Sequence, residues 1–384
     1  MKAKKPIEWM NVLNSVLIAR SKDVAKNKIA AFDLDGTLIA TKSGRVFPKD
    51  EYDWRWWDPC IPKCLEKLHS EGYKLVIISN QNGLNSEKKI KSFKTKIEAI
   101  LNQIEPPILL LAAMEKDRYR KPMTGMWDWL MKNNSNLEVN KSQCFYVGDA
   151  AGRGDGWKLK RKKDHSCSDR KFADNVQIKF YTPEEYFLKE APAKFTWGGF
   201  NAKEHLALAL PQYSAEDTPL VPVDARQELV VCVGYPASGK SSFVKRYLVP
   251  KGYIYVNQDS LKSREKCVTA CQVAISGKKS VVVDNTNPDR ATRAVYIKLA
   301  QNAGVPVRCF YFGDNEDLAL HNNFYRAIHR PDEKRDVLST IAFRTFKSKL
   351  QEPTTMEGFS EVKKINFVFE GTEQDKEAWQ KWWH

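Results

Sequence analysis

Residues 28–38, KIAAFDLDGTL, join a short apolar run to a turn that carries two carboxylates. Lys28–Phe32 has the continuous apolar character of a strand that is buried on both faces of a parallel sheet. Asp33 and Asp35 follow this run and point the same way on extended chain. Gly36 then allows the backbone to turn. Because two close carboxylates repel each other, we expect a divalent cation or differently tuned pKa values here.

Similar apolar runs recur along the chain, with helical stretches between them. They lie at Tyr73–Ser79, Ile108–Ala113, Cys144–Val147, Glu228–Val233, Tyr253–Val256, Ser280–Val283 and Val305–Phe312. Residues 61–70 and 86–103 have the character of helices. Strands that alternate with helices predict an α/β fold with a largely parallel sheet in each half.

The length of 384 residues predicts two domains, at ~100–200 residues per domain. Several prolines interrupt any long element in the middle of the chain, at Pro192, Pro211, Pro219 and Pro222. We therefore expect a first domain at 1–190, a linker at 191–225 and a second domain at 226–384. The tryptophans near the end of the sequence are expected to pack on the second domain: Trp379, Trp382 and Trp383.

The chain is basic, with 62 lysines and arginines against 47 acidic residues, a net charge of +15. This excess favours a polyanionic partner, either nucleic acid or an acidic membrane face. Residues 108–114 form the longest apolar run, far short of the ~20 residues of a membrane span. The N-terminal sequence has no apolar signal core, and eight cysteines make no disulfide framework at this length. We expect an intracellular protein with reduced thiols.

Polar residues follow the other runs of the first half. They are Ser79 and Asn80, whose side chains suit phosphate oxygens, Lys121 before a proline, and Asp149 after a glycine. Because ligands bind outside the carboxyl ends of strands in open α/β sheets, these side chains are expected near Asp33.

These four motifs, in this order, resemble those of the haloacid dehalogenase superfamily, a family of phosphotransferases with a Rossmann-like fold. The resemblance implies that Asp33 is the nucleophile that becomes an aspartyl phosphate, and that Asp35 is the general acid and then the base. It implies phosphate contacts from Thr37, Ser79, Asn80 and Lys121, and a Mg²⁺ site at Asp33, the Asp35 carbonyl and Asp149. A second acid is expected at Asp155 or Asp169. Asp169 is favoured, with residues between Ala151 and Ser168 as an insertion.

The second half begins with a P-loop pattern, because a strand leads directly into the sequence GYPASGKS. Its backbone N–H groups are expected to cradle phosphates, with Lys240 on the β- and γ-phosphates and Ser241 on Mg²⁺. The expected ATP-binding residues are Gly234, Tyr235, Pro236, Ala237, Ser238, Gly239, Lys240, Ser241 and Ser242.

Carboxylates and arginines elsewhere in the second half complete a candidate kinase site. Asp259 is either the N-cap of a helix near Leu261 or a carboxylate that orients and deprotonates an alcohol. Asp284 and Asn285 follow the next strand and are expected to support the metal or the substrate. One or two of Arg290, Arg293, Arg326, Arg330 and Arg344 are expected to stabilise the transferring phosphoryl group, with Arg293 or Arg326 favoured.

The whole series of motifs, from about Ala30 to Phe369, resembles the polynucleotide kinase 3′-phosphatase family. The strings that carry this resemblance are FDLDGTL, SNQNG, YRKP, GDAAGR, GYPASGKS, NQDSL and VDNTNPD. It implies removal of 3′-phosphates from DNA ends and ATP-dependent phosphorylation of 5′-hydroxyls, with Asp259 as the kinase base. Members of the family from animals also have a domain that binds phosphopeptides, ahead of the phosphatase domain. The sequence before Lys28 is too short for such a domain, so we expect it to be absent here.

Two clusters of basic residues fit a nucleic-acid partner. The first, in the expected insertion, consists of Lys158, Lys160, Arg161, Lys162 and Lys163, and is expected to contact DNA backbone or act as a nuclear import signal. The second, Lys88, Lys89, Lys91, Lys94 and Lys96, lies on the expected second helix and is either a DNA contact or a solvated face. We expect a nuclear monomer that acts on single- and double-stranded DNA ends, nicks or gaps. The alternatives are a small-molecule kinase-phosphatase, an RNA end-healing enzyme and a scaffold with relic sites.

Overall fold

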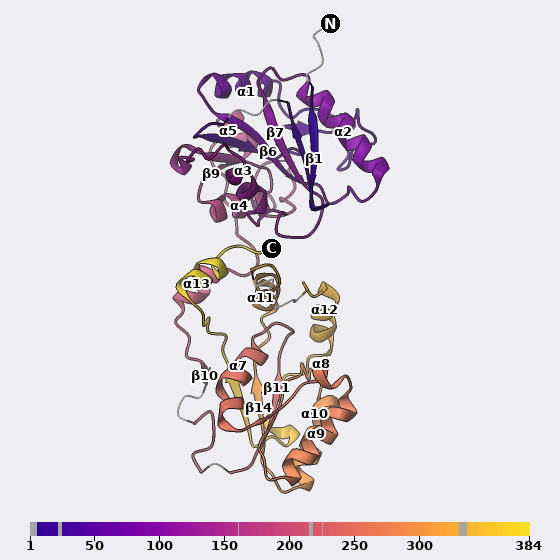
Figure 1. The fold of residues 1–384 in the computed structure, drawn as a ribbon, viewed down its shortest axis with the longest axis vertical. Helices are drawn as coiled ribbons and strands as arrows, with labels where there is room; N and C mark the ends of the chain where they lie inside the picture. Colours follow the sequence, from indigo (N-terminus) through magenta and orange to yellow (C-terminus); the bar gives the residue numbers. More distant parts are fainter. Residues whose placement is uncertain (1–5, 22–24, 160, 215–217, 225, 330–335) are drawn as a thin grey trace. The chain divides into compact units, whose positions relative to one another are not determined.

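The chain forms two compact units in a computed structural model that describes residues 6–21, 25–159, 161–214, 218–224, 226–329 and 336–384 (Figure 1). Unit 1 comprises Met1–Gly199 and Trp382–His384, and unit 2 comprises Phe200–Lys381. Both are α/β units with mainly parallel sheets, so the predicted fold class is confirmed. The division falls at Gly199, within the segment predicted as a linker. Trp382 and Trp383 belong to unit 1, and the expectation that they pack on the second domain is wrong.

Unit 1 is built on a seven-stranded sheet with the order β1-β2-β7-β6-β3-β8-β9. The strands are β1 (Glu8–Val12), β2 (Val16–Arg20), β7 (Ile108–Ala113), β6 (Lys74–Asn80), β3 (Ile29–Phe32), β8 (Phe145–Val147) and β9 (Lys179–Tyr181). The pairs from β7 to β9 are parallel, whereas β1 and β2 form an antiparallel hairpin on the β7 edge. No sequence pattern predicted this hairpin. A two-stranded ribbon of β4 (Ile39–Ala40) and β5 (Arg55–Trp56) lies outside the sheet.

Helices cover both faces of this sheet, which explains why its strands are apolar throughout (Figure 1). Ala30 and Phe32 of β3 pack in the core that contains α1 (Ile61–Ser70), α2 (Glu87–Leu101) and α5 (Pro183–Phe187). Ile29 and Ala31 of the same strand pack in the core that contains α3 (Gly125–Lys132) and α4 (Ser168–Val176). Successive side chains of one strand therefore serve opposite layers.

Unit 2 is built on a six-stranded sheet with the order β10-β15-β14-β11-β13-β12. The strands are β10 (Tyr213–Ser214), β15 (Glu361–Ile365), β14 (Val307–Tyr311), β11 (Leu229–Val233), β13 (Val281–Val283) and β12 (Ile254–Val256). Only the β10–β15 pair among these is antiparallel. The helices are α6 (Ala202–Ala207), α7 (Lys240–Tyr247), α8 (Gln258–Leu261), α9 (Arg264–Ser276), α10 (Arg290–Asn302), α11 (Glu316–His329), α12 (Thr340–Lys349) and α13 (Glu373–Trp379).

The unit 2 sheet is also covered on both faces. One core contains α9 and α10, and the opposite core contains α7, with alternate residues of β11 in each. A separate small core joins Tyr235 of the P-loop to α11 and α12 through Ala319, Phe343 and Phe346. The P-loop is therefore supported by two helices that lie between β14 and β15 in the sequence, as well as by its own strand.

A buried ionic network closes the end of this sheet opposite to the P-loop. Arg308 of β14 donates two hydrogen bonds to Glu228, each 2.6 Å long, and one of 3.0 Å to Glu361. Tyr253 also donates to Glu228, whose side chain is 2% exposed. Arg308 further donates to the backbone carbonyls of Pro219 and Leu220, and so fastens the segment before β11 to the sheet.

All eight cysteines are free thiols, and six of them are buried. Within the described part of the chain, no helix has the length and apolar character required to cross a bilayer.

We expect Arg308→Met to destabilise unit 2 by about 3–5 kcal/mol, because it leaves the Glu228 carboxylate buried without a cation. The measurement is urea unfolding followed by hydrogen exchange of the β11 and β14 amides. The matched control is Arg246→Met. Arg246 pairs with Glu370 at 3.0 Å, but its side chain is 60% exposed. The free energy of unfolding is therefore expected to fall by less than about 1 kcal/mol. Equal losses for the two variants would contradict the buried network.

Candidate functional site

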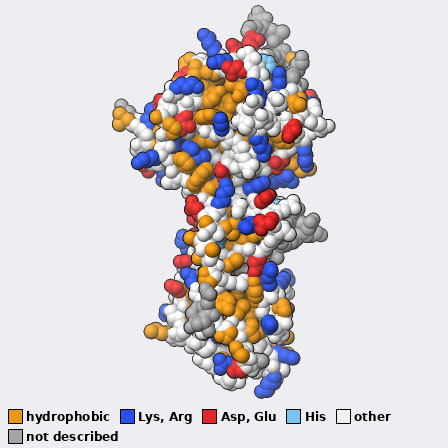
Figure 2. Space-filling model, turned by 90° about the vertical axis from the view of Figure 1, so that its left-hand side faces the viewer, with side chains coloured by type: hydrophobic (Ala, Val, Ile, Leu, Met, Phe, Trp, Pro, Cys, Tyr) orange, Lys and Arg blue, Asp and Glu red, His pale blue; other side chains and the backbone are white. Residues whose placement is uncertain are grey.

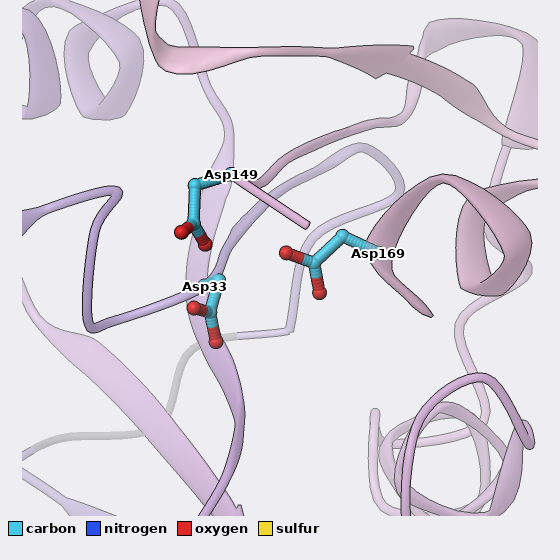
Figure 3. Close-up of side chains that lie close together, drawn as sticks. All are labelled: Asp33, Asp149 and Asp169. Atoms are coloured by element: carbon cyan, nitrogen blue, oxygen red, sulfur yellow. The ribbon is translucent and has the colours of Figure 1, made fainter. Parts of the chain in front are cut away.

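Three carboxylates meet at the carboxyl ends of the unit 1 strands (Figure 3). Asp33 follows β3, Asp149 follows β8, and Asp169 lies in the first turn of α4. One oxygen of each lies within 4.8 Å of the other two. The sheet order explains this convergence, because β3 and β8 are adjacent parallel strands and their carboxyl ends lie at the same edge.

A buried lysine lies among these carboxylates. The Lys121 Nζ atom is 2.8 Å from Asp33 Oδ1 and 2.7 Å from Asp169 Oδ1, and its side chain is 2% exposed. It also donates to the Tyr146 hydroxyl at 2.7 Å, and that hydroxyl donates to the backbone carbonyl of Ile78. Burial favours a neutral lysine, but the charges of Asp169 and Asp33 outweigh it and raise the pKa of Lys121.

The charges in this cluster do not balance, since three carboxylates surround one ammonium group. Burial raises the pKa of Asp33 to about 6, with Lys121 opposing the shift and Asp169 adding to it. Burial and the charges of Asp33 and Asp169 raise the pKa of Asp149 well above its usual range. An all-oxygen donor set with excess negative charge fits a hard divalent cation such as Mg²⁺.

Two glycines let the carboxylates approach so closely. Gly36 has φ +79°, and a Cβ atom there would lie 2.4 Å from Asp149 Oδ2. A Cβ atom at Gly148 would lie 2.4 Å from Asp169 Oδ2. Any side chain at either position would therefore displace a carboxylate of the cluster.

Asp35 lies at the solvent side of the cluster, with its side chain 49% exposed. Gln81 Nε2 donates to Asp35 Oδ2 at 2.7 Å and to Ser79 Oγ at 3.1 Å. Lys96 of α2 approaches the other Asp35 oxygen at 3.4 Å, although its own side chain is only 8% exposed. The solvated face that was one reading of the second basic cluster is therefore wrong for Lys96, which shares the buried side of α2 with Phe93 and Ile97.

Thr37 and Asn80, which were also predicted to contact phosphate, have different surroundings. The Thr37 hydroxyl is buried and has no hydrogen-bond partner among the described residues. Asn80 instead holds the Lys121 backbone, since its amide donates to the Lys121 carbonyl at 3.0 Å and accepts from the Lys121 N–H at 2.9 Å.

Of the two alternatives for a second acid, Asp169 lies in the cluster, whereas Asp155 is exposed and accepts from Lys163 N–H.

The P-loop of unit 2 connects β11 to α7. Gly239 at its end has φ +96°, and α7 begins at Lys240. The Lys240 ammonium donates to the Gly234 carbonyl at 3.0 Å and to the Tyr235 carbonyl at 2.5 Å. Burial lowers the pKa of Lys240 to about 8, against the opposing charge of Asp284.

A cavity of about 590 Å³ opens over this loop. Its lining includes the continuous run Ala237–Ser242, all of which was predicted to bind ATP. The aromatic side chains of Phe312, Phe367 and Phe369 also line it, as does Arg326 of α11. A cavity with a phosphate-binding loop and apolar walls suits a nucleotide.

The carboxyl ends of β12 and β13 supply two further acids. Asp284 is buried and accepts a 2.6 Å hydrogen bond from the Tyr255 hydroxyl, and Asn285 accepts from the Gln258 N–H at 2.8 Å. Asn257 caps α8 by accepting from two backbone N–H groups, so Asp259 is not the N-cap that one alternative required. The Asp259 carboxylate is exposed at the first turn of α8.

Arg293 does not have the surroundings expected of a group that contacts a transferring phosphate. It is fully buried, donates to both Glu357 oxygens at 2.7 and 2.6 Å, and donates to two backbone carbonyls. It does not line the P-loop cavity, whereas Arg326 does. Of these two arginines, Arg326 therefore lies beside the P-loop, whereas Arg293 is held by Glu357.

Only part of the basic run in the predicted insertion is accessible for contact with nucleic acid. Lys158 is held by Glu190 at 2.6 Å, and Lys160 lies outside the described residues. Arg161, Lys162 and Lys163 are exposed. On the face shown in Figure 2, lysine and arginine side chains are spread among acidic and apolar ones instead of forming one patch.

Comparisons with known proteins give similarities over both units. A family model described as "Polynucleotide kinase 3 phosphatase" matches residues 28–187, and one described as "AAA domain" matches residues 265–353. The chain is 41% identical to "Bifunctional polynucleotide phosphatase/kinase" of Schizosaccharomyces pombe, over 100% of this chain and 90% of that protein. It is 37% identical to "Polynucleotide 3'-phosphatase ZDP" of Arabidopsis thaliana, over 44% of this chain and 25% of that protein. It is 27% identical to "Polynucleotide 3'-phosphatase" of Saccharomyces cerevisiae, over 41% of this chain and 87% of that protein.

We expect Gly36→Ala to weaken divalent-cation binding by unit 1 at least tenfold, because the added methyl group displaces Asp149. Mn²⁺ binding measured by calorimetry tests this. Gly44→Ala is the matched control, since Gly44 also has a positive φ, +71°, but has no neighbouring atom within 4 Å. Both variants carry the backbone strain of a left-handed alanine, and only the first is expected to lose the cation. Equal binding by both would rule out the close approach of Asp149 as the basis of the site.

Proposed function

The chain belongs to the bifunctional polynucleotide phosphatase/kinase family, and we propose that it makes broken DNA ends ligatable by removing 3′-phosphates and phosphorylating 5′-hydroxyls. The observation that supports this is the presence of one phosphate-handling site in each unit. Unit 1 contains the carboxylate cluster around Asp33, and unit 2 contains the P-loop cavity around Lys240. The two activities together leave a 5′-phosphate and a 3′-hydroxyl.

In unit 1, Asp33 acts as the nucleophile. Its free carboxylate oxygen attacks the phosphorus of the 3′-phosphate, an aspartyl phosphate forms, and the bond from phosphorus to the 3′-oxygen breaks. Asp35, exposed beside the cluster, gives its proton to the departing 3′-oxygen. It then takes a proton from a water molecule that attacks the aspartyl phosphate, and this step releases phosphate and restores Asp33.

The residues around Asp33 keep it in place for this attack. Lys121 fixes one Asp33 oxygen and offers positive charge to the phosphoryl oxygens, while Asn80 holds the Lys121 backbone. The Thr37 hydroxyl, which is buried without a partner among the described residues, and the Ser79 hydroxyl would donate to the phosphate. Asp33, Asp149 and Asp169, with the Asp35 carbonyl, would hold Mg²⁺, which would supply positive charge to stabilise the phosphoryl group.

In unit 2, Asp259 is the general base. Its exposed carboxylate takes the proton of the 5′-hydroxyl, the resulting oxygen attacks the γ-phosphorus of ATP, and ADP leaves. Residues 234–242 would hold the phosphates and Ser241 would hold Mg²⁺, while Asp284 and Asn285 would support the metal or the substrate. Arg326, at the cavity wall, stabilises the charge that develops on the transferring phosphoryl group.

We further propose that the substrates are the ends, nicks and gaps of DNA, and that the protein acts in the nucleus as a monomer. The net charge of +15 supports a polyanionic substrate, because a small phosphorylated metabolite needs no such excess. RNA ends and small phosphomonoesters are the competing substrates that the experiments below must separate.

The decisive experiment incubates the protein with labelled DNA that carries a 3′-phosphate and a 5′-hydroxyl, with and without ATP and Mg²⁺. We expect Asp33→Asn to abolish 3′-phosphate release, by at least 10³-fold, and to leave 5′-phosphorylation within twofold. Lys240→Ala is expected to give the reverse pattern. Each variant is the matched control for the other, because the two residues lie in different units.

Loss of both activities in either variant, with the fold intact by circular dichroism, would mean that the sites are not independent. Equal rates on an RNA of the same sequence, or on a small sugar phosphate, would assign the site to one of the competing substrates.

We expect Arg161→Ala/Lys162→Ala/Lys163→Ala to weaken DNA binding and to flatten its dependence on salt. Each lost phosphate contact lowers the slope of log K against log[salt] by about 0.9, so a change of about 1–3 is expected. Lys63→Ala/Lys67→Ala, which removes two exposed lysines of α1, is the control and should keep the wild-type slope. Identical slopes for all three proteins would exclude the 161–163 segment as a contact.

A further inference from the structure

The segment Trp382–His384 belongs to unit 1, although the helix before it, α13, belongs to unit 2. Trp382 is 5% exposed, and its ring stacks on Trp197 with a centroid distance of 5.0 Å and an interplanar angle of 19°. Its indole N–H donates to Asp174 Oδ2 at 2.7 Å. The segment is therefore held in a defined position on unit 1.

The surface that receives Trp382 is α4, the helix that carries Asp169. Lys171, Asp174 and Asn175 all lie on this helix. Lys171 Nζ lies 4.7 Å from the centre of the Trp382 ring and donates to the His384 carbonyl at 3.1 Å. The segment thus contacts α4 at three positions within its first eight residues.

Asn175 is the residue that links this contact to the catalytic cluster. Its Oδ1 atom accepts from the Trp382 N–H at 2.8 Å, and its Nδ2 atom donates to the Trp382 carbonyl at 2.8 Å. The same Nδ2 atom donates to the Pro122 carbonyl, also at 2.8 Å. Pro122 directly follows Lys121, so one amide group joins the segment, α4 and the loop that carries the catalytic lysine.

This link fixes a distance on which the reaction depends. Lys121 and Asp169 come from different elements, a loop and a helix, and must meet at 2.7 Å. Asn175 is six residues beyond Asp169, about 9 Å along the helix axis. Helix and loop are therefore joined at two points, by the ion pair inside the cluster and by the Asn175 amide outside it.

We propose that Asn175 and Trp382 are positioning residues for the 3′-phosphatase reaction: together they hold α4, and with it Asp169, at the correct separation from the Lys121 loop. The inference rests on the proposed function of unit 1 and extends it. Neither residue belongs to the carboxylate cluster, so they act through Lys121 and Asp169. A displacement of about 1 Å at reacting groups can lower a rate on the order of 100-fold.

The test uses Asn175→Asp in the full chain. The new carboxylate has the shape of the amide, but it faces the Pro122 and Trp382 carbonyls with an acceptor instead of a donor. We expect the phosphatase kcat to fall about 10- to 100-fold, the KM for 3′-phosphorylated DNA to stay within threefold, and the Kd for Mn²⁺ to rise. Kinase kcat, measured on the same sample, should stay within twofold.

Two substitutions of Trp382 give a second test, because they remove different parts of its contacts with unit 1. Trp382→Phe keeps a ring on Trp197 and loses the bond to Asp174, so a loss of a few-fold is expected. Trp382→Ala loses the side-chain contacts with Trp197, Asp174 and Lys171 and keeps only the backbone bonds to Asn175, so its loss should approach that of Asn175→Asp. The matched control is Asn133→Asp, because the Asn133 amide donates to the Trp129 carbonyl at 2.8 Å within the end of α3, apart from the cluster. It should leave both activities unchanged.

A phosphatase kcat within twofold of wild type in both Asn175→Asp and Trp382→Ala would overturn the proposal. So would equal losses of phosphatase and kinase activity, or a loss that Asn133→Asp shares. If the wild-type protein released no 3′-phosphate, the proposed function would fail on its own. Mn²⁺ binding would then decide the positioning role, and an unchanged Kd in Asn175→Asp would exclude it.

Discussion

The buried ion pairs of Lys121 are the interaction on which unit 1 depends. One ammonium group holds Asp33 at the end of a strand and Asp169 at the start of a helix, with Asp149 beside them. Removing the lysine charge would leave carboxylates that cannot all ionise in a buried space. The glycines, the Asn80 bonds to the Lys121 backbone and the Tyr146 hydroxyl all serve to keep this one arrangement possible.

The candidate phosphate sites of the two units have opposite charge, although both units are α/β folds with mainly parallel sheets. Unit 1 gathers negative charge at the strand ends, which suits a cation and a carboxylate nucleophile. Unit 2 presents backbone N–H groups, a helix N-terminus and Lys240, which suit the direct binding of phosphates. In both, the candidate site lies at the carboxyl ends of parallel strands. The ionic network of Arg308 lies at the other edge, where it stabilises the sheet and carries no reacting group.

Sequence patterns were sufficient wherever one residue type has one structural use. Continuous apolar runs located the central strands to within a residue or two, and the motifs at their ends supplied Asp33, Asp149 and the P-loop. Long-range pairing was not accessible in the same way. A guanidinium such as Arg293 is indistinguishable in sequence from one that contacts phosphate until Glu357 is placed beside it. The burial of Lys96 could have been predicted, because Lys96 falls on the apolar side of its helix with Phe93 and Ile97. No sequence pattern predicts the β1–β2 hairpin or the packing of Trp382 on unit 1.

Because unit 1 is assembled from two separated stretches of chain, it has a consequence for synthesis on the ribosome. Residues 1–199 can collapse as soon as they emerge, but the segment that packs against α4 is made only after the whole of unit 2. Domains generally fold as units in the order of their synthesis, N-terminal first. The first unit to begin folding is therefore the last to be completed, and a nascent chain would carry a finished P-loop before its carboxylate cluster is fully supported.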